Sequence, residues 1–241
     1  MIGTIILAAG KGHRFGEMKQ FKKHNGVSPL DVVHAKFAPV SKIMVLVVPD
    51  EMLSVDYYAE EAVAGGEYRL ESIKNGLEIL KDREEVTHVI IAEAARPFIE
   101  IQCINEMVEA GNWHELAVVF SPCPHVIMQD VSEYLGYKYD HGLWVHKPRG
   151  SIRLIEPPSM WKKQLLKDVL ANIKPRTASS QVPAAYAPLF TSNIQWVNAH
   201  CRNPKITFKH EFSMFEKYVE TEECQRILEQ SKNAASIVGK G

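Results

Sequence analysis

The residues best suited to chemistry lie near the start of the chain, in a glycine-rich segment that follows an apolar run. Gly10, Gly12 and Gly16 are accompanied by Arg14 and Lys19. Glycines let backbone N–H groups approach phosphate oxygens closely, and Arg and Lys supply countercharge. This segment therefore predicts a loop that holds a polyphosphate.

Two better-known phosphate loops do not fit residues 7–16. A Walker A loop requires GxxxxGK followed by Ser or Thr, which this segment lacks. A dinucleotide loop requires GxGxxG, whereas the spacing here is GxGxxxG with a histidine and an arginine inside the turn. Two strong cations suit a triphosphate better than a dinucleotide. On the pattern of this loop alone, a plain strand-to-helix turn stays an alternative.

Composition argues against several classes of protein. Lys plus Arg number 28 and Asp plus Glu 29, so no global charge favours nucleic acid or an anionic membrane. The four cysteines are widely spaced and form no metal-binding motif, which indicates free thiols in a reducing compartment. No apolar run is long enough to span a membrane, and the first cations follow the first apolar run instead of preceding it. We therefore expect a cytoplasmic protein.

Short apolar runs alternate with helical patterns in the first half of the chain. This alternation is typical of βαβ units and predicts an α/β fold, a Rossmann-like wound and mostly parallel sheet, formed by residues 1–241 as one domain. We predict strands over residues 4–8, 43–48, 88–92, 117–121, 194–197 and 205–208. We predict helices over residues 30–37, 71–81, 101–110, 160–173 and 211–229.

The pattern breaks over residues 122–158, which contain five prolines and several aromatic residues. This segment is too small to bury a core of its own, so we predict a projecting arm of short strands. Its aromatic residues suggest a partner surface. A long irregular loop folded against the body is the alternative.

Two further segments establish a resemblance: GGEYRLESIKNGL at residues 65–77 and AEAARPF at residues 92–98. Together with LAAGKGHRFGEMKQF, their order and spacing resemble those of the cytidylyltransferases that act on methylerythritol phosphate and ribitol phosphate. The family forms are approximately AAGxGxRMxxxxPKQF, GGxxRxxSVxxGL and HDAARPF. Nearer the end of the chain, residues 202–207 are similar to the family's NIKIT segment, and Arg149 aligns with an arginine of its arm.

The resemblance implies a transfer of CMP from CTP to a small phosphorylated polyol, with release of pyrophosphate and help from Mg²⁺. It implies a homodimer formed through the arm, with no nucleic acid or membrane partner. It carries site roles over residue by residue. The CTP phosphates are assigned to Ala8, Ala9, Gly10, Gly12, Arg14 and Lys19; the cytosine to Gly66, Glu67, Arg69 and Ser72; the acceptor phosphate to Arg96, Arg149 and Lys205; the metal to Glu93; and catalysis to Arg14, Lys19 and Lys205.

Departures from the family patterns concentrate in the substrate half. Glu93 replaces the family's aspartate, and Ala92 the histidine before it. The threonine-proline-glutamine of the family becomes Glu156, Pro157 and Pro158, and its TDxAS-like stretch becomes residues 180–184, so several hydroxyl donors are missing. His125, Arg149 and Lys205 are the remaining candidates for contact with the acceptor.

Two hypotheses follow from this uneven match. Either the acceptor differs while the nucleotide half is kept, in a pathway to isoprenoids or surface polymers, or catalysis has been lost and the fold binds a nucleotide as a scaffold. A sugar-phosphate nucleotidyltransferase that uses another nucleotide is a third possibility. A hydrolase is disfavoured, because no GxSxG elbow surrounds Ser121, Cys123 or His125.

Overall fold

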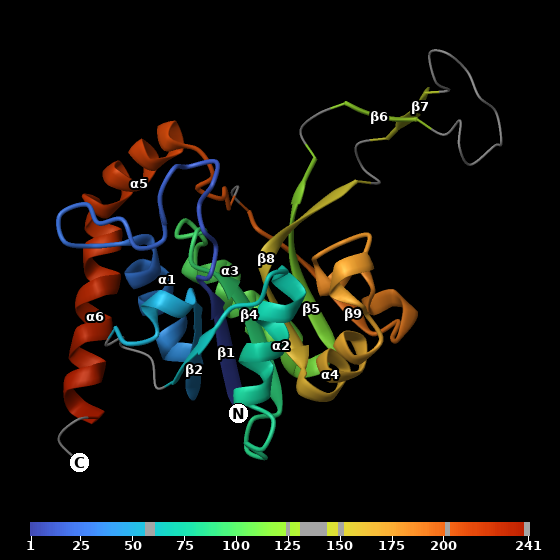
Figure 1. The fold of residues 1–241 in the computed structure, drawn as a ribbon, viewed down its shortest axis with the longest axis horizontal. Helices are drawn as coiled ribbons and strands as arrows, with labels where there is room; N and C mark the ends of the chain where they lie inside the picture. Colours follow the sequence, from blue (N-terminus) through green and yellow to red (C-terminus); the bar gives the residue numbers. More distant parts are fainter. Residues whose placement is uncertain (56–60, 124–125, 131–143, 149–151, 201–202, 239–241) are drawn as a thin grey trace.

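The structure is a computed structural model that describes residues 1–55, 61–123, 126–130, 144–148, 152–200 and 203–238. Its centre is a seven-stranded sheet in the order β3-β2-β1-β4-β8-β5-β9 (Figure 1). β8 runs antiparallel to β4 and β5, and the other paired neighbours are parallel. The strands are β1 (Ile2–Leu7), β2 (Ile43–Val48), β3 (Glu61–Ala64), β4 (His88–Glu93), β5 (Leu116–Pro122), β8 (Arg153–Lys162) and β9 (Ile194–Asn198). The predicted α/β fold with a wound, mostly parallel sheet is confirmed.

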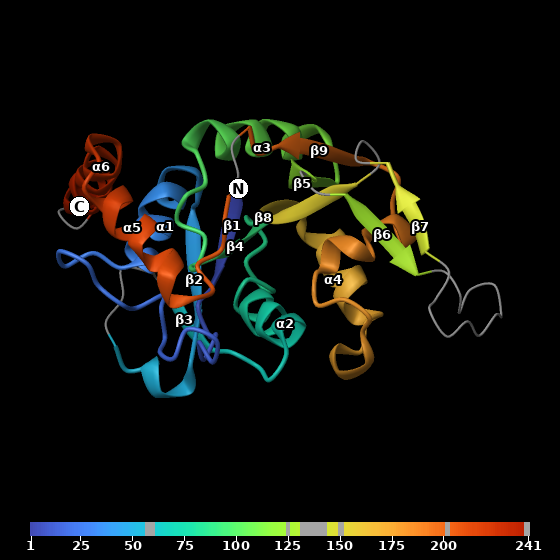
Figure 2. The same ribbon diagram turned by 90° about the horizontal axis from the view of Figure 1, so that it is seen from above.

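Helices cover both faces of this sheet, as Figure 2 shows. On one face α1 (Pro29–Phe37) and α3 (Ile101–Trp113) pack on the strands, and on the other α2 (Arg69–Ile79) and α4 (Lys163–Ala171) do so. α5 (Phe212–Val219) and α6 (Glu222–Val238) form a further layer outside α1. Single-turn 3₁₀ helices are η1 (Ala38–Val40), η2 (Asp50–Met52), η5 (Pro175–Thr177), η6 (Pro183–Ala185), η7 (Ala187–Leu189) and η8 (Lys209–Glu211).

The sequence explains where the first helix starts. Ser28 caps α1: its hydroxyl accepts a hydrogen bond from the backbone of Asp31, and the Asp31 carboxylate accepts one from the backbone of Ser28. Pro29 occupies the first turn, where its missing N–H is not needed. Leu30, Val33 and Phe37 of this helix pack against the sheet. The capping box fixes where α1 begins after the glycine-rich loop.

The parallel strands β1, β2, β3 and β4 end at the same edge of the sheet. The four segments that follow them are therefore brought together, although they are far apart in the sequence. In wound parallel sheets, ligands bind outside this carboxyl edge. Three of those segments are the glycine-rich loop and the two segments that complete the family resemblance.

Three predicted elements are wrong in detail. β8 includes residues 160–162, predicted as helix, because Met160 and Trp161 are apolar in succession and fit a strand covered on both faces as well as a helix. Residues 205–207 are irregular, since Ile206 N–H donates to the Ala95 carbonyl in a loop and not to a neighbouring strand. The predicted helix over 211–229 is interrupted after α5, where the Thr221 hydroxyl accepts a hydrogen bond from the Cys224 N–H and starts α6.

The arm is shorter than the predicted range of 122–158. β6 (Ile127–Asp130) and β7 (Trp144–Lys147) form a separate antiparallel pair that projects from the body (Figure 1). Residues 153–158 instead belong to β8 in the central sheet. Prolines 157 and 158 made this segment look unlike a strand in the sequence. They lie opposite the register shift between Val118 and Phe120 of β5, and a bulge tolerates proline.

Within the part of the chain that the structure describes, no helix combines the length and the apolar character needed to cross a membrane.

Candidate active site

The glycine-rich loop runs from the end of β1 to Gln20. The Gln20 side-chain amide donates hydrogen bonds to the carbonyl oxygens of Ala8 and Gly10, at 2.5 and 2.8 Å. Phe15, which belongs to the loop, is buried and packs edge-on against Phe212, with 5.8 Å between the ring centroids. These anchors hold the loop in place and leave its front free to face a ligand.

Gly12 is required by the backbone of this loop. Its φ is +69°, a conformation that L side chains rarely adopt, and a Cβ there would lie 1.9 Å from the Glu17 carbonyl oxygen. At Gly10, by contrast, an added Cβ would meet nothing within 4 Å. Gly12 does not line the cleft described below, so its role is to form the turn.

We expect Gly12→Ala to lower the free energy of unfolding by about 1–3 kcal/mol, because the loop must shift away from Glu17 to relieve the clash and the strained φ. Urea unfolding of the ligand-free protein measures this loss. Gly10→Ala is the matched control and should change stability by less than about 0.5 kcal/mol. Equal losses for the two variants would contradict the assigned role of Gly12.

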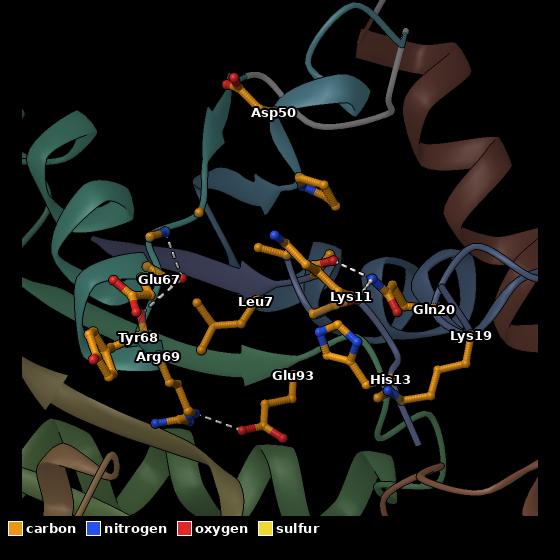
Figure 3. A pocket seen from close by; sticks show the side chains of 18 of the residues that line it. Leu7, Lys11, His13, Lys19, Gln20, Asp50, Glu67, Tyr68, Arg69 and Glu93 are labelled. Atoms are coloured by element: carbon orange, nitrogen blue, oxygen red, sulfur yellow. Dashed lines mark hydrogen bonds and ion pairs between the residues drawn. The ribbon is translucent and has the colours of Figure 1, made fainter. Parts of the chain in front are cut away.

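A cleft of about 740 Å³ opens at the carboxyl edge of the sheet (Figure 3). Its volume lies in the range of small-molecule sites. Of the residues predicted from the sequence, those that line it are Ala8, Ala9, Gly10, Lys19, Gly66, Glu67, Arg69, Ser72, Glu93 and Lys205.

Other lining residues were not predicted: Lys11, His13, Gln20, Asp50, Glu51 and Tyr68 are the polar ones. Lys11, His13 and Gln20 belong to the glycine-rich segment itself, so the motif could have pointed to them. Asp50 and Glu51 follow β2, and no sequence motif marks them. Arg149 and His125, both predicted to contact the acceptor, lie outside the described residues.

The segment from Gly65 to Ser72 forms a second wall of the cleft. A Cβ on Gly65 would lie 2.2 Å from the Cβ of Ala9, so glycine is what lets this segment touch the first loop. The Gly66 N–H donates to the Ser72 hydroxyl at 3.1 Å, and that hydroxyl donates to the Tyr68 carbonyl. Ser72 therefore fixes the turn that leads into α2.

Glu93 lies on the cleft floor and holds three cations. Its carboxylate is 2.8 Å from Arg69 Nε, 2.9 Å from Lys205 Nζ and 3.4 Å from Arg96 Nε. Arg69 points toward it in Figure 3. Burial opposes ionisation of this side chain, which is 8% exposed, but Arg69, Lys205 and Arg96 outweigh burial and lower the pKa of Glu93 to about 2. Glu93 is thus a carboxylate at neutral pH.

Residues from the last third of the chain support this ion-pair cluster through hydrogen bonds. Arg69 Nη1 donates to the Gln181 carbonyl at 3.0 Å, and the Gln181 side-chain oxygen accepts from the Leu70 N–H at 3.3 Å. Arg96 Nη1 donates to the Asn203 carbonyl. Arg96 does not line the cleft, and these bonds favour the interpretation that it ties the loop down. Its predicted contact with the acceptor phosphate stays a prediction.

Lys19 lies in a field of positive charge. Its side chain is 9% exposed, and burial lowers the pKa of its amine, with Lys205 and Arg14 lowering it further. Arg14 itself is exposed, does not line the cleft, and lies over the ring of Phe208 at 5.7 Å. Gathering these cations is electrostatically unfavourable in the free protein. A polyphosphate in the cleft would relieve the repulsion.

The cleft offers a side chain suited to binding a divalent cation. Glu93 is ionised and faces the cleft, so it offers a hard oxygen ligand. Both of its oxygens already take part in ion pairs, and no group of three His, Cys, Asp or Glu side chains suited to a metal occurs among the described residues. Mg²⁺ commonly uses one or two carboxylates together with substrate phosphates and waters. The site fits a cation carried by a triphosphate, and does not fit a cage of protein ligands.

Known proteins resemble this chain over nearly its whole length. The model of the family described as IspD, 2-C-methyl-D-erythritol 4-phosphate cytidylyltransferase, matches residues 2–221. The 2-C-methyl-D-erythritol 4-phosphate cytidylyltransferase of Caldicellulosiruptor bescii is 27% identical over 84% of this chain and 86% of its own length. The bifunctional enzyme IspD/IspF of Rhodobacter capsulatus is 41% identical over 41% of this chain, which spans only 27% of that relative.

Solved structures share the fold. That of 4-diphosphocytidyl-2C-methyl-D-erythritol synthase from Anaerococcus prevotii superposes with a TM-score of 0.72 and 17% identity, covering 92% of this chain and 99% of the other.

Proposed function

Because the chain belongs to the 2-C-methyl-D-erythritol 4-phosphate cytidylyltransferase family, we propose that it transfers CMP from CTP to a phosphorylated polyol and releases pyrophosphate. The acceptor we favour is 2-C-methyl-D-erythritol 4-phosphate, the compound in the family's description. The observation that carries the proposal is the convergence of Lys19 and Lys205 on a cleft whose buried carboxylate is Glu93, with Arg14 close enough to lower the pKa of the Lys19 amine. Such a site suits a ligand with several negative charges.

The reaction is an in-line attack of an acceptor phosphate oxygen on the α-phosphorus of CTP. A new P–O bond forms, the bond from the α-phosphorus to the bridging oxygen breaks, and pyrophosphate leaves with that oxygen. No covalent enzyme intermediate is needed, so catalysis depends on positioning and on neutralising charge. Backbone N–H groups of the first loop, with Lys19 and Arg14, hold the triphosphate, and Lys205 faces the acceptor phosphate.

Cytosine binds at the second wall, against Gly66, Glu67, Arg69 and Ser72. The bond from the Gly66 N–H to the Ser72 hydroxyl supports this assignment, because it holds the backbone of residues 65–68 in one arrangement at the cleft. Bound Mg²⁺ supplies further countercharge to the triphosphate, with Glu93 as its proposed protein ligand.

The protein acts in the cytoplasm as a homodimer in which the arm of one copy contacts the other, and Arg149 is kept as a proposed contact of the acceptor. Exposed apolar side chains of the β6–β7 pair, and that of Val126 immediately before β6, support the dimer. Val126 is 60% exposed, Met128 48% and Val145 42%. Residues 1–241 form one catalytic domain in this proposal.

A panel of nucleotides and acceptors tests the proposal. The protein is incubated with Mg²⁺, one of CTP, UTP, ATP or GTP, and either 2-C-methyl-D-erythritol 4-phosphate or ribitol phosphate, and pyrophosphate is measured. We expect release with CTP and one of the acceptors. Thermal stabilisation by each nucleotide alone separates the alternatives, since only a ligand that prefers the folded state raises stability. Stabilisation by CTP without release would favour the scaffold hypothesis, and equal stabilisation by all four would contradict the cytosine assignment.

A further inference from the structure

Lys205 lies at the cleft without a helix or strand to hold it. Residues 203–207 have no regular secondary structure, yet Lys205 Nζ is 2.9 Å from Glu93. A lysine side chain with freedom at four torsions needs a fixed backbone to present its amine at one place. The anchors of this segment therefore decide where the Lys205 amine lies.

One anchor follows Lys205 and another precedes it. After Lys205, Ile206 is fully buried and its N–H donates to the Ala95 carbonyl at 2.9 Å. Before Lys205, Asn203 is 1% exposed, and its side-chain amide donates to the Pro157 carbonyl at 2.8 Å. The Asn203 N–H donates to Glu156 Oε2 at 3.1 Å.

Glu156 is the unusual member of this arrangement. Its carboxylate is buried and accepts hydrogen bonds from two neutral donors, the Ser121 hydroxyl at 2.6 Å and the Asn203 N–H. None of the ion pairs recorded for the described residues includes it. A buried carboxyl group needs hydrogen-bond donors to replace the water that it loses. Its two accepted bonds indicate what the side chain does there.

We propose that Glu156 is a positioning residue: it clamps Asn203 to β8 and thereby holds the Lys205 amine beside Glu93 at the cleft. The role requires an acceptor at the Oε2 position and not a negative charge. Glu156→Gln preserves such an acceptor, whereas Glu156→Ala leaves the Asn203 N–H unpaired and releases the segment. Residues 156–158, which replace the family's threonine-proline-glutamine, thus serve the site by supporting Lys205.

Differential lysine labelling tests this positioning without relying on activity. The protein is treated briefly with an amine-acetylating reagent, and the acetylation rate of each lysine is read by peptide mass spectrometry. In Glu156→Ala we expect Lys205 to react several-fold faster than in the unaltered protein, because its amine no longer stays paired with Glu93. Buried Lys36 serves as an internal control, since a general loss of structure would raise its rate as well. Glu156→Gln should leave Lys205 at its original rate.

Kinetics supply a second test, which rests on the proposed function. We expect Glu156→Ala to raise the KM for the acceptor by about 10- to 100-fold, with little change in the KM for CTP. An effect of this size is typical when a group that contacts the substrate is displaced by roughly an ångström. Adding Glu156→Ala to Lys205→Met should have little further effect, because the positioned group is already gone. Val169→Ala, a buried truncation on α4, controls for a general loss of stability and should leave both KM values in place.

Particular outcomes would overturn the proposal. An unchanged acetylation rate of Lys205 in Glu156→Ala would do so, and so would a Glu156→Gln protein that behaves like Glu156→Ala. Full additivity of Glu156→Ala with Lys205→Met would also contradict it. If Glu156→Ala does not fold, Glu156→Met takes its place: it fills the same space without an acceptor for the Asn203 N–H, and it should accelerate Lys205 labelling in the same direction. An unaltered protein that releases no pyrophosphate would contradict the proposed function, while the labelling result still decides the role of Glu156.

Discussion

Replacing Lys19 by methionine is expected to lower kcat by about 10²- to 10³-fold, the effect typical of removing one preorganised charge or donor from a transition state. The amine faces the cleft from a side chain that is 9% exposed, and methionine has a similar length without the charge. Charge that develops on the transferred phosphate then loses a partner that water cannot readily replace. Steady-state pyrophosphate release at saturating CTP measures the change.

The Lys19→Met substitution should not lower the stability of the protein, although it lowers kcat. Burial, Lys205 and Arg14 all lower the pKa of the Lys19 amine, so the charged form is unfavourable in the free protein. We therefore expect Lys19→Met to be as stable as the unaltered protein or more so, by thermal unfolding. Lys22→Met is the control: Lys22 is 2.5 Å from Glu17 and does not line the cleft, and its loss should leave kcat in place. A Lys19→Met enzyme that keeps more than about a tenth of kcat would contradict the role.

The second large effect concerns Glu93. We expect Glu93→Gln to lower the free energy of unfolding at pH 7 by about 3 kcal/mol, because it removes the shared anion of Arg69, Arg96 and Lys205 at a buried position. Glu51→Gln is the control, since Glu51 is an exposed carboxylate at the same cleft. Urea unfolding of both variants measures the difference. A loss as small as that of the control would show that the three cations do not depend on Glu93.

The difference in the free energy of unfolding between the unaltered protein and Glu93→Gln should depend on pH. The pKa of Glu93 is about 2 in the folded protein against an ordinary value of 4.5, so its stabilising effect is present above the unfolded pKa and is lost as pH falls through the folded one. The stability difference between the unaltered protein and Glu93→Gln should be constant near neutrality. It should shrink as pH falls from about 4.5 toward about 2. A difference that grows on acidification would contradict the ion-pair cluster.

The sequence predicted the part of the cleft formed by the glycine-rich loop and residues 65–72 better than the contacts that residues 156–205 make around it. Glycines and short motifs report on local backbone geometry, and the carboxyl ends of parallel strands must meet at one edge. That is why Gly10, Lys19, Gly66 and Arg69, from motifs far apart in the chain, line the same cleft; their roles toward a nucleotide stay predictions.

Residues 156–205 make contacts that no local pattern encodes. Glu156, Gln181 and Asn203 looked like lost hydroxyl donors or ordinary polar residues, yet they hold Arg69, Arg96 and the Lys205 segment through hydrogen bonds across more than forty residues of sequence. β8 was hidden by two consecutive prolines, and its course shortened the predicted arm. Long-range hydrogen bonding by residues at strand ends and in loops leaves no periodicity to read.

Transfer of CMP to the acceptor would leave a diphosphate-linked product that can be observed directly. ³¹P NMR of the protein with CTP, Mg²⁺ and 2-C-methyl-D-erythritol 4-phosphate follows every phosphorus atom at once. We expect the acceptor's phosphomonoester signal to be replaced by a pair of coupled diphosphate doublets, with inorganic pyrophosphate formed in equal amount. The Lys19→Met protein should give neither signal on the same time scale. Retention of the monoester signal under conditions in which CTP binds would contradict the account.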